Sequence, residues 1–179
     1  MNKRVLILSS SPRRGGNSDI LCERFAKGAM ESGNDVQIIF LGHKKINYCS
    51  GCERCLETHA CVQDDDVQDI LEKMVCSDVL VFASPVYFYS MSAQLKTLID
   101  RTLPRYEEMS CKDIYMILTA ADEHEEMLYR AAESIRGFTE DCLDCCEEKG
   151  VIYGVGAWKK GDIENTDAYM DAYYMGKEV

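Results

Sequence analysis

Ten residues near the start of the chain have the character of an anion-binding loop. They run Ser9-Ser10-Ser11-Pro12-Arg13-Arg14-Gly15-Gly16-Asn17-Ser18 and join a short apolar segment to a predicted helix. The N–H groups and the dipole at a helix N-terminus favour an anion, and glycines let the backbone approach it closely. Residues 1–18 carry four cationic side chains and no acid, in a chain of net charge -11. We therefore predict a phosphate site here; the alternative is a solvated turn in which Ser18 is an ordinary N-cap.

The same segment lacks the patterns of three other phosphate-handling sites. It contains no G-x-x-x-x-G-K-[ST], which a nucleoside-triphosphate P-loop needs, and no G-x-G-x-x-G, which marks Rossmann-type dinucleotide binding. A phosphoacceptor receiver domain would need carboxylates in this segment, and there are none. The predicted ligand is therefore neither a nucleoside triphosphate nor a Rossmann-bound dinucleotide.

A second loop contains three consecutive aromatic residues. It runs Ser84-Pro85-Val86-Tyr87-Phe88-Tyr89-Ser90-Met91-Ser92 and follows an apolar segment. A flat ring system could lie against this backbone, with the N–H and C=O groups contacting the ring edge. A hydrophobic patch for oligomer contacts is the alternative, and both hold if the site lies at a dimer seam. A phosphate site and a flat-ring site together fit one mononucleotide with a large ring, which is FMN.

Four cysteines, Cys49, Cys52, Cys55 and Cys61, lie in a connection that spans residues 42–63 and is called here the cysteine loop. Connections longer than about 12–15 residues are commonly functional or disordered. The spacing C-x2-C-x2-C-x5-C can place four thiolates around an iron–sulfur cluster, as in ferredoxin-type sequences, or around zinc. Three interpretations stay open: an iron–sulfur cluster, a zinc site or labile disulfide, and thiols that bind no metal.

The elements that position these loops follow from hydrophobic patterning. Strands are predicted at Val5–Leu8, Val36–Leu41, Val79–Ala83, Ile114–Thr119 and Val151–Val155. Helices are predicted from Ser18 to about Gly33 and at Asp64–Val75, Gln94–Leu103, Glu125–Lys149 and Asp167–Met175. Helices between strands require parallel pairing and right-handed crossovers. The sequence therefore predicts an α/β fold: a doubly wound, five-stranded parallel sheet, flavodoxin-like, with strand order 2-1-3-4-5.

This topology predicts where a ligand binds. In doubly wound sheets, ligands lie beyond the carboxyl ends of the strands, at the point where the strand order reverses. That point falls between the first and third strands, which are followed by the two loops above. Five further cysteines are expected to be buried free thiols in helical segments; they are Cys22, Cys76, Cys142, Cys145 and Cys146.

Length and charge exclude several classes of protein. The 179 residues predict a single domain over residues 1–179. An acidic chain is a poor partner for nucleic acid and for an anionic membrane surface. No apolar run approaches the ~18 residues of a membrane span, and the run Val5–Leu8 is too short for a secretory signal. We expect a cytoplasmic protein whose ten cysteines are thiols, metal ligands or redox groups.

The sequence resembles the flavodoxin-fold NADPH-dependent FMN reductase family. The resemblance is carried by SSSPRRGGNS, YCSGCERCLETHAC, SPVYFYSMSAQLKTLIDR and GAWKKGD. It implies that the FMN phosphate is held by Ser11, Arg13, Asn17 and Ser18, and that the isoalloxazine is lined by Pro85, Val86, Tyr87 and Phe88. Ser9 is also expected to bind the cofactor. It also implies a homodimer or tetramer with the flavin near a subunit contact. Trp158 in the last motif is expected to close over the site or to contact a neighbouring subunit.

Three functions follow as hypotheses. The first is an FMN-dependent oxidoreductase that passes hydride from NAD(P)H through FMN to a quinone, azo compound, free flavin or similar small-molecule acceptor; this chemistry needs no catalytic side chain. The second is suggested by the cysteine motif, which resembles that of the iron–sulfur flavoproteins: an electron carrier with a [4Fe-4S] cluster on Cys49, Cys52, Cys55 and Cys61, exchanging electrons with ferredoxin. The third is a flavodoxin-like binding module with a zinc loop.

Overall fold

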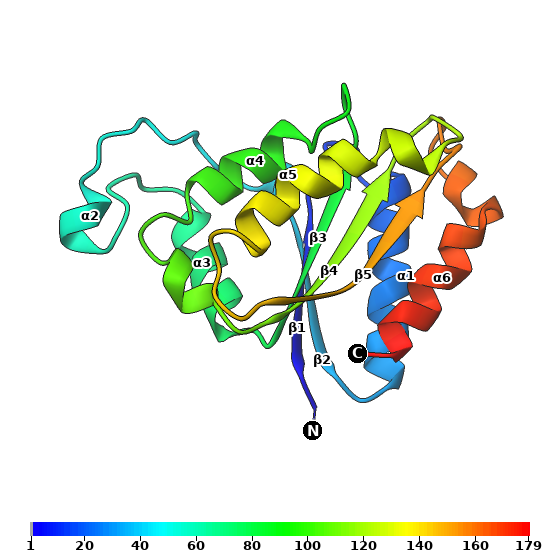
Figure 1. Cartoon of the computed structure of the whole chain (residues 1–179), viewed down its shortest axis with the longest axis horizontal. Helices are drawn as coiled ribbons and strands as arrows, with labels where there is room; N and C mark the ends of the chain where they lie inside the picture. The colour runs from blue at the N-terminus through cyan, green and yellow to red at the C-terminus, as the bar shows by residue number, and fades with distance from the viewer. Residues whose placement is uncertain (1) are drawn as a thin grey trace.

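Five parallel strands form one sheet in the computed structural model, which describes residues 2–179 (Figure 1). The strands are β1 (Arg4–Ser9), β2 (Asp35–Phe40), β3 (Val79–Pro85), β4 (Asp113–Thr119) and β5 (Glu147–Gly154). Their order is β2-β1-β3-β4-β5, and every pairing is parallel. The predicted flavodoxin-like topology is therefore confirmed, with the reversal of strand order between β1 and β3.

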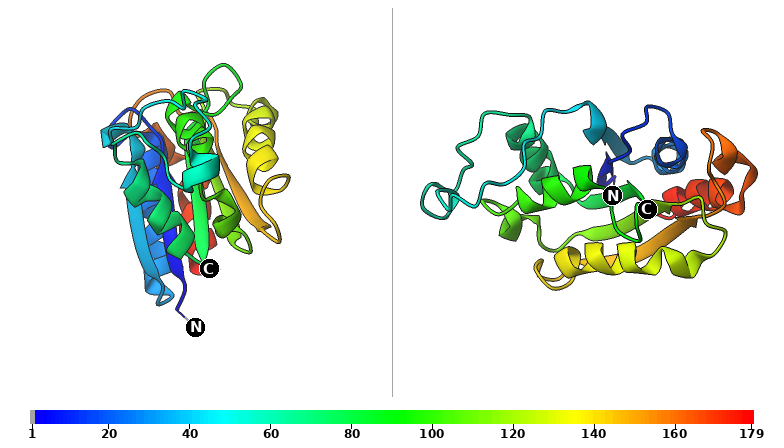
Figure 2. Two further views of the ribbon diagram at one scale, coloured as in Figure 1. Left: turned by 90° about the vertical axis from the view of Figure 1, so that its left-hand side faces the viewer. Right: turned by 90° about the horizontal axis from the view of Figure 1, so that it is seen from above.

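Helices cover both faces of this sheet (Figures 1 and 2). One face carries α1 (Asn17–Glu31) and α6 (Asp167–Lys177), and the other carries α3 (Val67–Cys76), α4 (Ala93–Asp100) and α5 (Tyr129–Thr139). The remaining segments are α2 (Cys55–Thr58) and short 3-10 turns at Leu41–His43, Tyr106–Met109, Glu125–Met127 and Asp162–Asn165. Within the described residues, no helix is both long enough and apolar enough to cross a membrane.

Side chains of the central strands fill a core on each face of the sheet. In β1, Val5 and Ile7 pack with α1 and α6, whereas Leu6 and Leu8 pack with α3, α4 and α5. Every residue of β3 is buried. This strand pairs along both edges and is covered on both faces, so its sequence is apolar without alternation. The carboxyl edge of the sheet is thus a rigid base for the loops that leave it.

The segment between α5 and β5 differs from the prediction. The predicted helix Glu125–Lys149 is wrong, because α5 ends at Thr139 and β5 already begins at Glu147. Residues 140–146 are mostly Asp and Cys, which are weak helix formers, and acids are unfavourable at a helix C-terminus. The first residues of β5 are polar because β5 is an edge strand, so hydrophobicity did not reveal them.

The cysteines of this segment therefore lie in a loop. Cys145 forms a disulfide with Cys111, which joins the starts of β4 and β5 at the edge of the sheet opposite the carboxyl ends. Cys142 is exposed and Cys146 is partly buried. The expectation of buried free thiols is thus wrong for these three residues and for exposed Cys76, and only Cys22 fulfils it. Burial raises the pKa of the Cys22 thiol.

Candidate functional site

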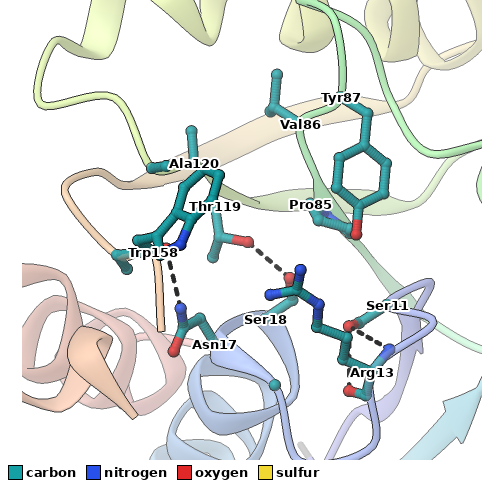
Figure 3. Close-up of a pocket in the computed structure, with 13 residues that line it drawn as sticks. Ser11, Arg13, Asn17, Ser18, Pro85, Val86, Tyr87, Thr119, Ala120 and Trp158 are labelled. Atoms are coloured by element: carbon teal, nitrogen blue, oxygen red, sulfur yellow. Dashed lines mark hydrogen bonds between the residues drawn. The ribbon is translucent and has the colours of Figure 1, made fainter. Parts of the chain in front are cut away.

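A cavity open to solvent lies at the carboxyl edge of the sheet, where the two predicted loops meet (Figure 3). One wall comes from the loop after β1 and the start of α1, and it includes Ser11, Arg13, Asn17 and Ser18. The opposite wall comes from the loop after β3, with Pro85, Val86 and Tyr87. The ends of β4 and β5 close the remaining side. The structure therefore brings seven of the nine predicted FMN-binding residues around one space.

The first wall suits an anion. The N-cap of α1 is Gly16, which has extended backbone and makes no side-chain capping bond; the prediction of Ser18 as the N-cap is therefore wrong. Without a capping side chain, the first N–H groups of the helix stay available to a ligand. A Cβ on Gly16 would lie 2.9 Å from the Arg13 carbonyl oxygen and 3.2 Å from Ser11 Oγ, so the tight loop favours glycine. The Arg13 side chain extends toward Ser18 (Figure 3).

Ser9 and Asp19 hold this loop from below. The Ser9 hydroxyl donates to Asp19 Oδ1 at 2.5 Å, and the Gly15 N–H donates to Asp19 Oδ2 at 2.8 Å. Both Ser9 and Asp19 are buried. Ser9 was predicted to bind the cofactor, but it is not among the residues that line the cavity. Its role in the structure is to fix the loop through the Asp19 carboxylate.

Asn17 lines the cavity but uses its amide to position another loop. Its Nδ2 donates to the carbonyl oxygens of Ala157 at 3.0 Å and Lys159 at 2.9 Å. Its Oδ1 accepts a hydrogen bond from the Gly161 N–H at 2.9 Å. These three bonds hold the segment that carries Trp158 against the start of α1, which places the indole in the cavity wall.

Buried hydroxyl groups join the loops after β1 and β3. Ser10 Oγ donates to the Ala83 carbonyl oxygen at 2.8 Å and accepts from Ser92 Oγ at 2.8 Å. The Ser92 N–H donates to Ser84 Oγ at 2.8 Å. All three serines are buried. Buried hydrogen bonds therefore connect the two loops that form the walls of the cavity.

A tight turn at the top of the second wall carries the aromatic run. Tyr87 and Ser90 exchange backbone hydrogen bonds of 3.0 and 3.1 Å. The two residues between them are left-handed, with φ of 49° at Phe88 and 63° at Tyr89. Phe88 is fully exposed at the tip and does not line the cavity, unlike Pro85, Val86 and Tyr87. The predicted ring-binding surface thus divides into three residues at the cavity and one at the rim.

Sequence reasoning missed residues from the other two strand ends. Thr119 and Ala120, at the end of β4, line the cavity, as does Ala157 after β5. Thr119 Oγ1 shares a hydrogen bond of 2.7 Å with Ser18 Oγ, which links β4 to α1. The rule that ligands lie beyond the carboxyl ends of the strands would have pointed to them, because β4 was predicted to end at Thr119.

The four thiols of the cysteine loop are free. Cys49 and Cys52 are exposed, whereas Cys55 and Cys61 are partly buried. Hydrogen bonds from the backbone of Arg54 and the side chain of Ser50 lower the pKa of the Cys52 thiol. Among residues 2–179, no three His, Cys, Asp or Glu side chains gather so that they could hold a metal ion. Four free thiols on one loop have the donor chemistry of an iron–sulfur site, but the structure does not bring them together.

A buried ion pair lies beneath the cysteine loop. Arg101 Nη1 and Nη2 donate to the two Asp65 carboxylate oxygens at 2.8 and 3.1 Å, and both side chains are almost completely buried. Burial by itself would raise the pKa of Asp65. The hydrogen bonds from Arg101 and from the N–H groups of Asn47 and Val67 outweigh that effect, so the pKa of Asp65 lies below its ordinary value of 3.8.

A family model described as NADPH-dependent FMN reductase matches residues 3–135, which is most of the chain. The chain belongs to this family. Membership agrees with the resemblance found in the loop sequences and with the flavodoxin-like sheet.

Relatives of this member of the FMN reductase family include two curated proteins, each named iron-sulfur flavoprotein. One, from Archaeoglobus fulgidus, is 41% identical over 113 residues, which cover 63% of this chain and 51% of the relative. The other, from Methanocaldococcus jannaschii, is 42% identical over 101 residues, which cover 56% of this chain and 52% of the relative. The chain spans about half the length of these curated relatives.

A solved structure shares the fold over its whole length. The NAD(P)H:quinone oxidoreductase from Methanothermobacter marburgensis has a TM-score of 0.75 and 19% identity, and the match covers 99% of this chain and 97% of that protein. At this identity, the likeness shows the fold alone. It agrees with the parallel five-stranded sheet that the FMN reductase family member adopts.

Proposed function

We propose that the chain is an FMN-dependent oxidoreductase that uses NAD(P)H as the reductant. The observation that carries this proposal is the meeting of an anion-binding loop and an apolar, aromatic loop at one cavity. A helix N-terminus and Arg13 suit the phosphate of a mononucleotide, and Pro85, Val86 and Tyr87 suit a flat ring. FMN, when bound, supplies the hydride and electron-transfer chemistry. The physiological acceptor is a small molecule such as a quinone, an azo compound or a free flavin.

The residues of the chain bind and orient the cofactor in this proposal. Ser11, Arg13 and Ser18, together with the α1 amides, hold the phosphate. Ser9 and Asn17 support that contact indirectly, through the buried Asp19 carboxylate and through the loop that carries Trp158. Phe88, at the exposed tip of its turn, contacts the ring only if the turn or a second subunit brings it over the cavity.

Cofactor binding and turnover test the proposal separately. The purified protein is titrated with FMN and the quenching of flavin fluorescence is followed, and the loaded protein is then assayed with NADH and with NADPH in the presence of quinone, azo and flavin acceptors. We expect one FMN per chain and acceptor-dependent oxidation of at least one nicotinamide. Protein that stays colourless with excess FMN would refute both the binding of FMN and the reductase activity. Flavin binding without any oxidation of NAD(P)H would refute the reductase activity. It would leave the second candidate function, an electron carrier, which is described below.

Trp158→Ala is expected to weaken FMN binding about three- to tenfold, the scale of one aromatic contact. The indole lines the cavity although it is 73% exposed, so a bound ring would cover it. Fluorescence titration of wild type and variant measures the change. Tyr174→Ala is the control, because this residue is also an exposed aromatic but lies on α6 outside the cavity. Equal losses in the two variants would show that Trp158 does not contact the flavin.

The cysteine loop supports a second candidate, an electron carrier that pairs FMN with a [4Fe-4S] cluster and exchanges electrons with ferredoxin. Four free thiols at the spacing of a cluster motif favour it, as do the names of the two curated relatives. Anaerobic purification followed by iron and sulfide assays tests it. About four irons per chain would support the carrier, and iron-free protein after reconstitution would eliminate it.

Assembly and location belong to the same proposal. We infer a homodimer or tetramer, supported by the exposed aromatic side chains of Phe88, Tyr89 and Trp158 near the cavity. We also propose that residues 1–179 form a single FMN-binding domain. A cytoplasmic location is part of the same proposal, and the eight free cysteines support it. Light scattering of the FMN-loaded protein checks the assembly, and a monomer at micromolar concentration would contradict it.

A further inference from the structure

Trp158 lies on a short loop that is bounded by two glycines, Gly156 and Gly161, and is called here the tryptophan loop. Both glycines have left-handed backbone, with φ of 70° and 92°. The Gly156 N–H donates to the Asp122 carbonyl oxygen at 2.6 Å, which fixes the start of the loop on the segment after β4. The rest of the loop is held from the other side, by the first residue of α1.

That residue, Asn17, uses both donors of its side-chain amide on the tryptophan loop. An asparagine amide has two N–H donors on Nδ2 and one acceptor oxygen. The two donors of Asn17 go to the carbonyl oxygens of Ala157 and Lys159. The amide oxygen accepts from the Gly161 N–H. These three partners also fix the orientation of the amide, because two carbonyl oxygens need donors and an N–H needs an acceptor.

The Asn17 side chain has no donor left for a phosphate. A phosphate oxygen accepts hydrogen bonds, so the amide could serve it only by giving up one of its bonds to the tryptophan loop. Figure 3 shows Asn17 beside Trp158. Ser11 and Arg13, which suit the phosphate, lie together in another part of the wall (Figure 3). Different side chains therefore serve the phosphate and hold the indole.

Burial does little to hold Trp158, because the residue is 73% exposed. The hydrogen bonds of its loop keep the indole in the cavity wall. We propose that Asn17 is a positioning residue for the ring of the flavin and not a phosphate contact. It fixes the tryptophan loop before the ligand binds, which lowers the entropy cost of ordering Trp158 against the ring. This inference rests on the proposed function, in which FMN occupies the cavity.

The test uses two ligands that differ only in the phosphate, FMN and riboflavin. Their dissociation constants are measured by fluorescence titration for wild type and for Asn17→Ala, Arg13→Ala, Trp158→Ala and the double variant Asn17→Ala/Trp158→Ala. Arg13→Ala is the matched control, because Arg13 lines the same cavity but is assigned to the phosphate. Circular dichroism melts establish that each variant is folded.

We expect Asn17→Ala to weaken the binding of FMN and of riboflavin by the same factor, about three- to tenfold, which is the scale of one aromatic contact. Arg13→Ala should weaken FMN binding by about tenfold or more, through the loss of one charge-assisted hydrogen bond, and should change riboflavin binding by less than about twofold. The double variant should bind FMN no more than about twofold worse than the weaker single variant, whereas losses from independent contacts would multiply.

The unliganded protein gives a second readout that does not depend on a flavin. Trp158 is the only tryptophan of the chain, so tryptophan fluorescence reports on this loop alone. We expect Asn17→Ala to lower the fluorescence anisotropy of the indole and to raise its quenching by acrylamide, because the loop loses three hydrogen bonds. Arg13→Ala should match wild type in both. Asn17→Asp keeps the acceptor for the Gly161 N–H but loses both donors, and it carries the riboflavin and anisotropy comparisons if Asn17→Ala unfolds.

The outcomes separate the role of Asn17 from the proposed function. Wild type that binds neither flavin refutes the proposed function and the role of Asn17 toward the ring with it. If wild type binds both, a loss in Asn17→Ala that is confined to FMN identifies Asn17 as a phosphate contact and refutes the positioning role alone. Unchanged anisotropy in Asn17→Ala refutes that role as well. If riboflavin binds wild type too weakly to titrate, the FMN measurements decide, and multiplied losses in the double variant overturn the proposal.

Discussion

Arg13→Glu is expected to weaken FMN binding by at least 100-fold. Arg13 lines the cavity and extends across the anion-binding wall (Figure 3). In the proposed complex, the substitution removes a charge-assisted hydrogen bond, worth about 1.5–3 kcal/mol, and puts a carboxylate next to the phosphate. A 100-fold loss corresponds to about 2.8 kcal/mol, so the lost bond and the repulsion together account for it. Fluorescence titration with FMN measures the dissociation constant.

The neighbouring arginine supplies the control for this prediction. Arg14→Glu makes the same change in net charge one residue along, and Arg14 is exposed but does not line the cavity. We expect its effect to stay within about threefold and to fade at high salt, because exposed charges are screened beyond the Debye length. If both variants lost affinity equally, the loop would attract the phosphate only through its overall charge, and the assignment of Arg13 as a contact would be wrong.

Asp65→Asn is expected to lower the free energy of unfolding by about 3–5 kcal/mol at pH 7, the usual cost of breaking a buried ion pair by removing one partner. The change leaves the Arg101 guanidinium buried without its counter-charge, since the side chains of both residues are inaccessible. Domains of this size are stable by only about 5–15 kcal/mol, so the loss would be a large fraction. Urea denaturation followed by circular dichroism measures it.

The difference in the free energy of unfolding between wild type and Asp65→Asn is expected to shrink as the pH falls. Asp65 has a lower pKa in the folded chain than its ordinary value of 3.8, so the unfolded chain binds its proton first as the pH falls. Its contribution is fully present above pH ~5 and is lost as the pH falls through the folded pKa. Wild type and Asp65→Asn should therefore converge in stability in acid. Asp100→Asn is the control, because Asp100 forms an exposed pair with Lys96, of a kind worth about 0.3–0.5 kcal/mol.

The strands of the sheet could be predicted because the sequence patterns that mark them lie within a few consecutive residues. Continuous apolar runs such as Val79–Ala83 mark strands that are buried on both faces, and their alternation with helices leaves few topologies. The prediction failed between α5 and β5, where the edge strand begins with polar residues and an acidic loop has the residue composition of a solvated helix. The Cys111–Cys145 disulfide also had no local signal, because its partners are brought together only by the pairing of β4 with β5.

The candidate site was predictable to the extent that it depends on strand ends. The loops after β1 and β3 were expected at one place, and their residues do share a cavity. Which polar side chains of these loops face the cavity and which ones hold the loops in place was not predictable. The Asn17 side chain binds the loop that carries Trp158, and the Ser9 hydroxyl binds Asp19. These partners could not be predicted, because the hydrogen-bond partners of a polar side chain depend on elements far away in the sequence. Arg101 is the clearest case, since its position after α4 gives no hint that it reaches Asn47 and Asp65.

The left-handed turn at Phe88 and Tyr89 constrains how this sequence can evolve. Each non-glycine residue in that conformation costs about 1–2 kcal/mol, and Phe88 is fully exposed, so burial within the subunit does not compensate for the cost. Asn-Gly would form the same turn with little strain. Drift toward greater stability would therefore remove the aromatic pair. A version of the protein with Asn-Gly at these two positions would be more stable but would lose both aromatic rings of the turn.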